Sequence, residues 1–286
     1  PEIIFSTSNN TIYAISNNGT ILNGWPKHLD NSIEFNIVLS DLTGDNIPEI
    51  IAPADKIIYA WYSNGTEVFG WPVKLNTYIT RSLATCDFND DNFSELVVVC
   101  NDKIYLLNKN GFVLSSWPKS SEDGSAWLAP IIVDVDFDGN LDIIAITQKG
   151  ETYVFDYTGK EQFHVIANFE DTLVNDPVLA CDSSNMWRII VSSEHSLYFI
   201  NFTNNTFSLF SFKQDKKILG YLASKSGLLF TVWSETLEYS LATGPSTLEP
   251  WKAAQGNSYN TRSTIQHLKY PNLFPWPISW DTTQII

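Results

Sequence analysis

A unit of 46 residues recurs along this chain, and a repeat of that length constrains the fold more than any local propensity does. Its clearest marker is a Trp followed by Pro, at Trp25, Trp71 and Trp117. An Asn-Gly pair lies upstream of each marker, at residues 18–19, 64–65 and 110–111. Asn-Gly between apolar runs is typical of a β-hairpin, because both residues tolerate a positive φ. The repeat is therefore built from strands and tight turns.

An acidic residue gives the register of the repeat, because it opens the second strand of each copy. These residues are Glu2, Glu49, Glu95 and Asp142. Residues 182–193 and 228–240 are weaker fifth and sixth copies. Each unit holds about four short strands and shows no helical periodicity, which is the pattern of a propeller blade. The sequence thus predicts an all-β fold, a β-propeller of four-stranded blades.

The copies predict six blades, with seven as the alternative. The expected blade repeats lie near residues 1–33, 34–79, 80–126, 127–173, 174–219 and 220–268. The segment 76–82, which leads into an innermost strand, recurs in similar form at 257–263, whereas the first copy lacks that strand. We therefore expect residues 261–268 to complete the first blade and close the ring, so that the first blade is closed by a C-terminal strand. Residues 269–286 are expected to be a C-terminal tail or the start of a linker or sorting segment.

Composition limits the kind of partner. Apolar residues make up 44% of the 286 residues and charged residues 17%, which suits a folded chain. The formal net charge of -15 argues against nucleic acid, which is bound through clustered Lys and Arg, and favours a cation. No apolar run is long enough to predict membrane insertion. Cys86, Cys100 and Cys181 contain no CxxC pair, so they predict buried thiols and neither a disulfide framework nor a zinc site.

A carboxylate-rich loop precedes three of the acidic strand openings, at residues 41–49, 87–95 and 134–142. Oxygen side chains stand at positions 1, 3, 5 and 9 of each loop, and position 7 can add a backbone carbonyl. Ca²⁺ takes six to eight oxygen ligands, so each loop is a candidate calcium site and up to three ions are expected. The predicted ligands are Asp41, Thr43, Asp45, Ile47 and Glu49; Asp87, Asn89, Asp91, Phe93 and Glu95; and Asp134, Asp136, Asp138, Asn140 and Asp142.

The three loops differ in charge. The third supplies four carboxylates and the other two supply three each, with Thr43 a weaker neutral ligand in the first. We therefore expect calcium affinity to decrease from the third loop to the second and then to the first. Position 6, at Asn46, Asn92 and Gly139, should adopt a positive φ. The alternative is that Asp and Asn only form turns between strands. Sodium and magnesium also remain open as the cation.

These loops and their spacing resemble the FG-GAP or VCBS type of propeller repeat, found in integrin α-subunits and in many secreted bacterial proteins. The resemblance is good over residues 1 to about 160 and weak beyond. It implies that each loop joins the innermost strand to the second strand and binds calcium on one face of the ring, with partners on the opposite face. In the fifth copy, residues 182–188 lack two of the carboxylates, so no metal is expected there.

The resemblance also implies a context. We expect the chain to be a fragment of a secreted or cell-surface protein of bacterial type, because it starts within a repeat. The segment 270–275 resembles the start of C-terminal sorting domains in a bacterial secretion system, although it could equally pack on the propeller.

The expected function is a non-catalytic calcium-binding module that mediates adhesion by binding a protein or carbohydrate. The face opposite the calcium loops would be lined by turns and blade links near Asp55, Asp102, Lys149, Tyr78, Arg81 and Trp127. Aromatic and Arg side chains are common binding anchors, although aromatics in a propeller are more often core. The alternative is a propeller domain of a secreted polysaccharide lyase or hydrolase, or an accessory domain of a secreted protease. No catalytic motif is present, so no catalytic residue is assigned. The oligomeric state is left open.

Overall fold

The strands form consecutive antiparallel sheets. This computed structural model describes residues 2–122, 124–136, 138–167, 169, 171–181, 187–203, 206–213, 218–224, 227–232 and 238–242. The first sheet holds β1 (Ile3–Thr7), β2 (Thr11–Ile15) and β3 (Lys27–His28). The second holds β4 (Val38–Ser40), β5 (Glu49–Ala54), β6 (Ile57–Trp61) and β7 (Val73–Lys74). The third holds β8 (Ala84–Cys86), β9 (Glu95–Cys100), β10 (Lys103–Leu107) and β11 (Lys119–Ser120).

The remaining sheets continue the same order. The fourth holds β12 (Ile131–Val133), β13 (Asp142–Ile146), β14 (Glu151–Phe155) and β15 (Glu161–Ile166). The fifth holds β16 (Asn175–Cys181), β17 (Trp187–Ser192), β18 (Ser196–Thr203) and β19 (Thr206–Lys213). The sixth holds β20 (Ile218–Ser224), β21 (Gly227–Val232) and β22 (Glu238–Ala242). Each sheet is a meander, because strands adjacent in sequence pair with each other.

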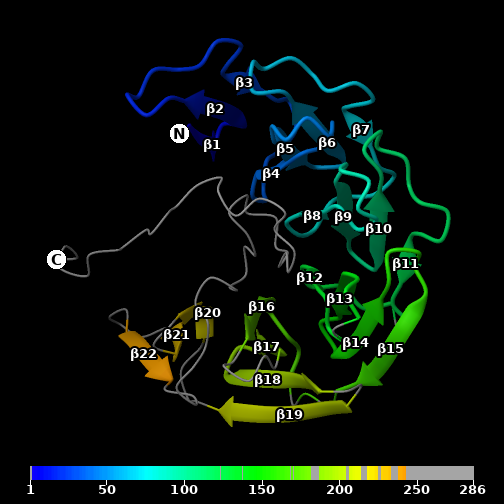
Figure 1. Ribbon diagram of the computed structural model, residues 1–286. Helices are drawn as coiled ribbons and strands as arrows, with labels where there is room; N and C mark the ends of the chain where they lie inside the picture. Colours follow the sequence, from blue (N-terminus) through cyan, green and yellow to red (C-terminus); the bar gives the residue numbers. More distant parts are fainter. Residues whose placement is uncertain are drawn as a thin grey trace.

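The sheets are arranged radially around a common centre (Figure 1). Strands β4, β8, β12, β16 and β20 lie nearest the centre, and β7, β11, β15 and β19 lie at the periphery. This is the blade arrangement of a β-propeller, so the predicted fold class is confirmed. In the part of the chain that the structure describes, no helix has the length and apolar character needed to span a membrane.

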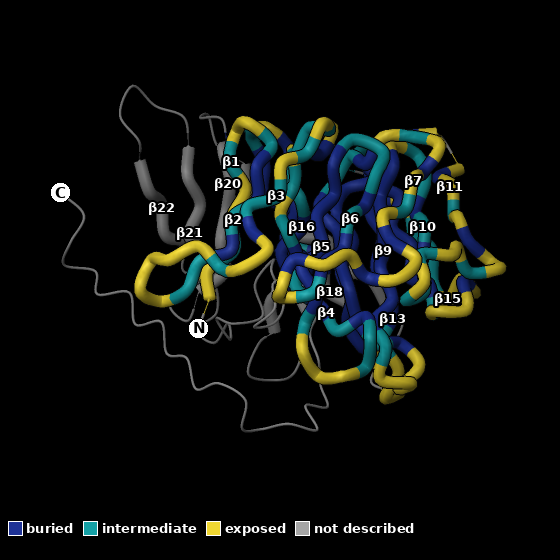
Figure 2. Tube along the Cα trace, turned by 90° about the horizontal axis from the view of Figure 1, so that it is seen from above, coloured by how far each residue is buried: buried dark blue, intermediate teal, exposed yellow. Residues whose placement is uncertain are grey.

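The second strand of a blade is buried on both sides, and its sequence explains why. Every residue of β9 is buried. Because successive side chains point to opposite faces of a strand, Leu96 and Val98 pack toward the second sheet, whereas Val97 and Val99 pack toward the fourth. A continuous apolar run is thus required where a sheet has neighbours on both faces. Figure 2 shows these buried strands between exposed turns.

The repeated Trp residues join neighbouring blades. Trp25, Trp71 and Trp117 are between 6% and 7% exposed, so they belong to the core. Each indole nitrogen donates a hydrogen bond to a carbonyl in the hairpin turn of the next blade. The acceptors are Ser63 at 3.0 Å, Lys109 at 3.0 Å and Tyr157 at 3.2 Å. The 46-residue spacing of the sequence is therefore the spacing of contacts between blades.

Several expectations about the repeat are confirmed. Glu49, Glu95 and Asp142 open β5, β9 and β13, and Cys86 and Cys100 are buried free thiols. Among the described residues, the first sheet has three strands and begins with the strand equivalent to β5, so it lacks an innermost strand as expected. The strand proposed to supply it, at 261–268, lies outside the described residues, as does the tail at 269–286. Ring closure and the blade boundaries stay predictions.

Candidate metal centre

The three carboxylate loops occupy equivalent places in the second, third and fourth sheets. Each joins the innermost strand to the second strand, as the resemblance implied. The residue before position 1 pairs with position 9 across the two strands: Ser40 with Glu49, Cys86 with Glu95 and Val133 with Asp142. The first and last acidic residues of each loop are therefore held at the base of a hairpin by its own β-ladder.

The position-1 aspartate shapes each loop. One carboxylate oxygen of Asp41, Asp87 and Asp134 accepts the backbone N–H of position 6, at 2.7, 2.8 and 3.0 Å. The residues at position 6, Asn46, Asn92 and Gly139, have φ values of 64°, 67° and 94°. These are residue types that adopt a positive φ readily. The expected sharp turn at position 6 is confirmed.

The side chain at position 5 makes a second backbone contact, which recurs in all three loops. The side chains of Asp45, Asp91 and Asp138 accept the backbone N–H of position 7, at 2.8, 2.9 and 2.7 Å. The position-7 residues are Ile47, Phe93 and Asn140, whose carbonyls were the expected backbone ligands. The same two side-chain contacts thus fold three loops of different sequence into one shape.

The position-9 carboxylates are buried. Glu49, Glu95 and Asp142 are between 1% and 4% exposed. Each accepts the backbone N–H of position 2, from Leu42 at 2.7 Å, Phe88 at 3.1 Å and Val135 at 3.2 Å. Burial, together with the nearby loop carboxylates, raises the pKa of each of the three carboxyls to about 7, although the backbone hydrogen bond to each one lowers it. A raised pKa means that ionising these buried carboxyls is unfavourable, and a bound cation makes the ionised form more favourable.

The third loop brings three carboxylates together. Oxygen atoms of Asp134, Asp136 and Asp138 all lie within 4.8 Å of one another. Asp134 is buried, whereas Asp136 and Asp138 are exposed. The donor set consists of oxygen atoms alone, which suits a hard cation such as Ca²⁺ better than a soft transition metal. These residues fit the expected ion.

The other two loops replace one of these carboxylates. Thr43 at position 3 of the first loop donates to Glu49 Oε1 at 3.3 Å. Asn89 at position 3 of the second loop donates through its amide to Asp91 Oδ2 at 3.2 Å. Position 3 is therefore hydrogen-bonded within the loop in both cases. Among the described residues, the third loop is the one in which three carboxylates lie within 4.8 Å of one another.

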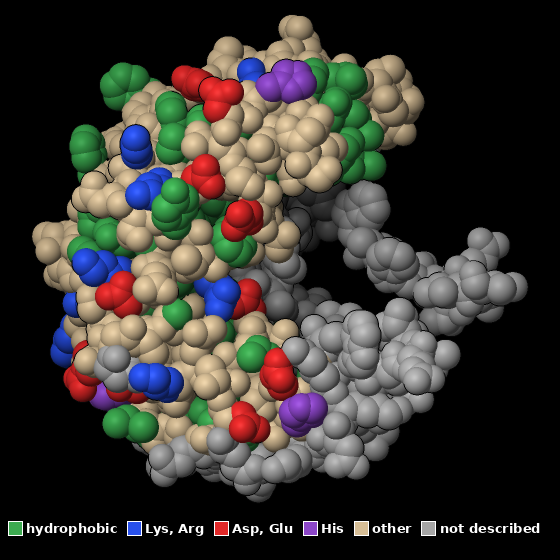
Figure 3. All heavy atoms as spheres, turned by 180° about the vertical axis from the view of Figure 1, so that it is seen from behind, with side chains coloured by type: hydrophobic (Ala, Val, Ile, Leu, Met, Phe, Trp, Pro, Cys, Tyr) green, Lys and Arg blue, Asp and Glu red, His purple; other side chains and the backbone are tan. Residues whose placement is uncertain are grey.

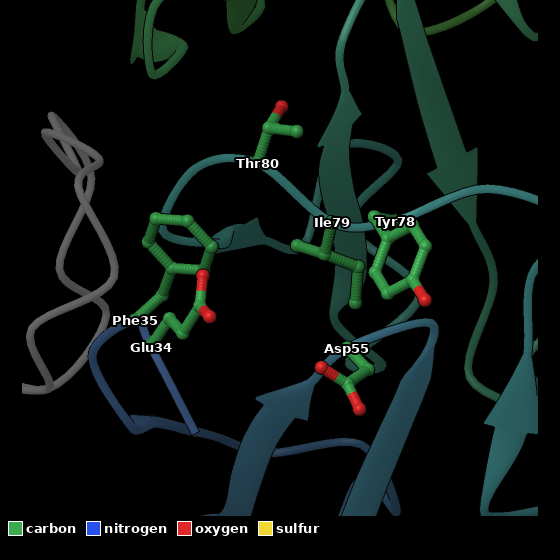
Figure 4. Close-up of a pocket in the computed structure, with 6 residues that line it drawn as sticks. All are labelled: Glu34, Phe35, Asp55, Tyr78, Ile79 and Thr80. Carbon is green, nitrogen blue, oxygen red and sulfur yellow. The ribbon is translucent and has the colours of Figure 1, made fainter. Parts of the chain in front are cut away.

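The opposite face of the ring contains a second feature, a cavity of about 350 Å³ beside the second blade (Figure 4). Its lining residues are Glu34, Phe35, Asp55, Tyr78, Ile79 and Thr80. Asp55 lies in the β5–β6 turn and accepts a hydrogen bond from Asn31 at 3.1 Å. The Tyr78 ring is 57% exposed, with the Lys56 ammonium 4.5 Å from its centre. Asp55 and Tyr78 were expected on this face, whereas Glu34 and Phe35, in the link between β3 and β4, were missed.

Two other residues expected on that face make contacts within the protein instead. Trp127 is fully buried and donates from its indole to the Asp102 carbonyl at 2.9 Å, so its expected role as a binding anchor is wrong. The Arg81 guanidinium lies 3.2 Å from Asp176, which joins the link before β8 to β16. This ion pair was not predicted, because nothing in the two local sequences connects them. Figure 3 shows a face on which acidic, basic and hydrophobic side chains are interspersed.

Comparison with known proteins agrees with the fold and with the loops. Residues 87–145 match the family model of the FG-GAP-like repeat, a stretch that contains the second and third loops. No curated protein matches the chain. The chain is thus a β-propeller that carries an FG-GAP-like repeat at residues 87–145.

Solved structures similar to this chain are β-propellers of low sequence identity. BBS1N, in complex with ARL6DN, aligns with a TM-score of 0.61 and 12% identity over 87% of this chain and 77% of that chain. Saccharomyces cerevisiae Sqt1 aligns with a TM-score of 0.60 and 11% identity over 84% and 69%. The Swd1 β-propeller domain of Myceliophteria thermophila aligns with a TM-score of 0.56 and 11% identity over 86% and 81%. At these identities the likeness concerns the fold alone.

Proposed function

We propose that this β-propeller is a non-catalytic module that binds calcium through three loops on one face. The observation that carries the proposal is the convergence of Asp134, Asp136 and Asp138, which place three carboxylates within 4.8 Å of one another. Like charges so close repel by roughly 1–4 kcal/mol per pair between bulk-water and near-surface dielectric. In the other two loops, the residues at positions 1, 5 and 9 have the same backbone hydrogen bonds, which supports equivalent sites there.

We further propose that the opposite face binds a protein or carbohydrate partner and that the module works outside the cell, in adhesion. The cavity beside Tyr78 supports a docking role, because it combines an exposed aromatic ring with two carboxylates, those of Glu34 and Asp55. Exposed aromatic side chains contribute strongly to recognition. Extracellular calcium suits flexible oxygen-rich loops, whose affinity is often modest.

Thermal unfolding tests the calcium proposal. We expect the metal-free protein in EDTA to melt at a lower Tm than the same protein in excess calcium, because a ligand that binds only the folded state stabilises it by mass action. Magnesium at equal concentration should raise Tm less, since it requires a stricter octahedron. Identical melting curves in EDTA and calcium would refute the proposal.

A further inference from the structure

The first two candidate calcium loops contact each other directly. The backbone N–H of Ser94, at position 8 of the second loop, donates to the carbonyl of Asp41, at position 1 of the first loop, at 2.9 Å. The Phe93 ring packs so closely on Gly44 of the first loop that a Cβ there would lie 2.8 Å from a ring carbon. The two loops therefore share an interface that includes one expected ligand residue from each loop, Asp41 and Phe93.

One peptide group lies at the centre of this interface. The Phe93 carbonyl, an expected ligand of the second loop, and the Ser94 N–H belong to the same peptide bond. A peptide bond is planar, so the direction of its carbonyl fixes the direction of its N–H. A Phe93 carbonyl held by a cation thus fixes the donor to the backbone carbonyl of Asp41, a residue whose side-chain carboxylate is an expected ligand of the first loop.

The Phe93 ring has a second contact, within its own blade. The ammonium of Lys109, in the β10–β11 connection, lies 3.0 Å from the ring centre. The carbonyl of Lys109 in turn accepts the indole N–H of Trp71. Phe93 therefore contacts the second blade through Gly44 and, through Lys109, is linked to Trp71 of the same blade. A shift of Phe93 would disturb contacts in both blades.

The second and third loops lack this connection. Among the described hydrogen bonds, none joins the Leu141 N–H, at position 8 of the third loop, to the Asp87 carbonyl. That carbonyl instead accepts a weak hydrogen bond from the Cys86 thiol at 3.5 Å. Position 7 of the third loop is Asn140, which has no aromatic ring to pack on the neighbouring loop.

We propose that the first and second loops bind calcium cooperatively through the Phe93–Ser94 peptide, whereas the third loop binds independently. The inference rests on the proposed calcium-binding function. Occupation of the second loop orders the donor to Asp41, so the first loop loses less conformational entropy when it binds calcium. Coupling between sites is reciprocal and typically amounts to a factor of 5–150 in affinity.

Calcium titration by calorimetry tests the coupling. The background carries Asp134→Asn and Asp138→Asn, so that the first two loops are titrated alone. We expect a Hill coefficient above 1. Adding Asp91→Asn disables the second loop, and the remaining site should bind at least about fivefold more weakly than the second binding step of the background protein. An unchanged affinity of the first loop on adding Asp91→Asn would overturn the coupling while leaving calcium binding intact.

A proline at position 8 isolates the hydrogen bond. The first loop already has Pro48 at this position, so the loop backbone accepts a residue without an N–H. Ser94→Pro should lower the Hill coefficient to 1 or below, and the matched change Leu141→Pro should leave it unchanged. If Ser94→Pro does not fold, the comparison with Asp91→Asn still decides. Absence of any calcium binding would reject the proposed function and this inference together.

Discussion

At the scale of single residues, the shape of the three loops depends on positions that recur, whereas their charge depends on a position that varies. Position 1 accepts the N–H of position 6 and position 5 accepts the N–H of position 7 in every loop. Position 3 varies, as Thr43, Asn89 and Asp136. Position 3 is hydrogen-bonded within the loop in each case, yet its residue type differs and so changes the number of carboxylates. Affinity can therefore differ between blades without a change of fold.

Substitution of two aspartates in one loop tests the predicted order of calcium affinity. Replacing Asp134 and Asp138 by Asn should remove most of the calcium-induced rise in Tm, because it takes two of the three converging charges from the third loop. The same change at Asp41 and Asp45 should remove a smaller part. Thermal melts with and without calcium check the order. Equal losses from both pairs would contradict the graded affinities.

The buried position-9 carboxyls predict a pH dependence of the metal-free protein. The pKa of Glu49 and of Glu95 is raised from 4.5 to about 7, and that of Asp142 from 3.8 to about 7, by burial first and by neighbouring carboxylates second. The folded state therefore binds these protons more tightly than the unfolded state. Their contribution to stability is full below the unfolded pKa values and is lost as pH rises through about 7.

Denaturant unfolding in EDTA at pH 5.5 and pH 8 tests the direction in which stability changes with pH. The free energy of unfolding should be lower at pH 8. Glu95→Gln should reduce the difference, because the neutral amide does not titrate and its oxygen can still accept the Phe88 N–H. Excess calcium should also reduce it, since a cation compensates the ionised carboxyls. A difference unchanged by Glu95→Gln would show that other groups cause it.

At the scale of elements, the sequence predicted the strands, the loops and the sharp turn at position 6, because each depends on residues close together in the chain. It could not predict contacts between blades. Ser94 with Asp41 and Arg81 with Asp176 are separated by many residues and carry no local signal. It also assigned Trp127 to a surface, because an aromatic at a blade link has the same sequence pattern whether it faces solvent or the next blade.

Two glycines of nearly equal φ test the contact between the first two blades. Gly24 and Gly19 have φ values of 83° and 84°. A Cβ on Gly24 would overlap the carbonyl of Asn64 in the next blade, whereas a Cβ on Gly19 would meet nothing within 4 Å. Both Ala variants incur the cost of a positive φ, about 1–2 kcal/mol. Gly24→Ala should cost several kcal/mol more, because the obstacle is backbone.

Chemical denaturation of the two Ala variants measures this difference directly. The Gly19→Ala protein reports the conformational cost alone and so serves as the control. Equal destabilisation by both substitutions would mean that the first two blades separate easily at this contact.

At the scale of the whole molecule, the first sheet, like the sixth, has three strands among the described residues. Its leading strand, β1, pairs with β2 alone. Ile3 and Phe5 on this strand are 57% and 39% exposed, whereas every residue of the equivalent strands β5 and β9 is buried. An exposed apolar edge strand is a site of unwanted pairing that natural proteins cover. This observation favours a further strand beside β1.

Two truncations test whether residues 261–268 supply that strand. Removing residues 261–286 should lower Tm by at least about 3 °C, because the covering of an apolar side chain is worth about 1.5–3 kcal/mol and 1 kcal/mol corresponds to about 2–4 °C for a domain of this size class. Removing residues 269–286 alone should change Tm little, since the expected strand remains. The longer truncation should also increase self-association, measured by light scattering, because it leaves β1 uncovered. If both truncations behave alike, residues 261–268 do not close the ring, and the strand beside β1 must come from elsewhere.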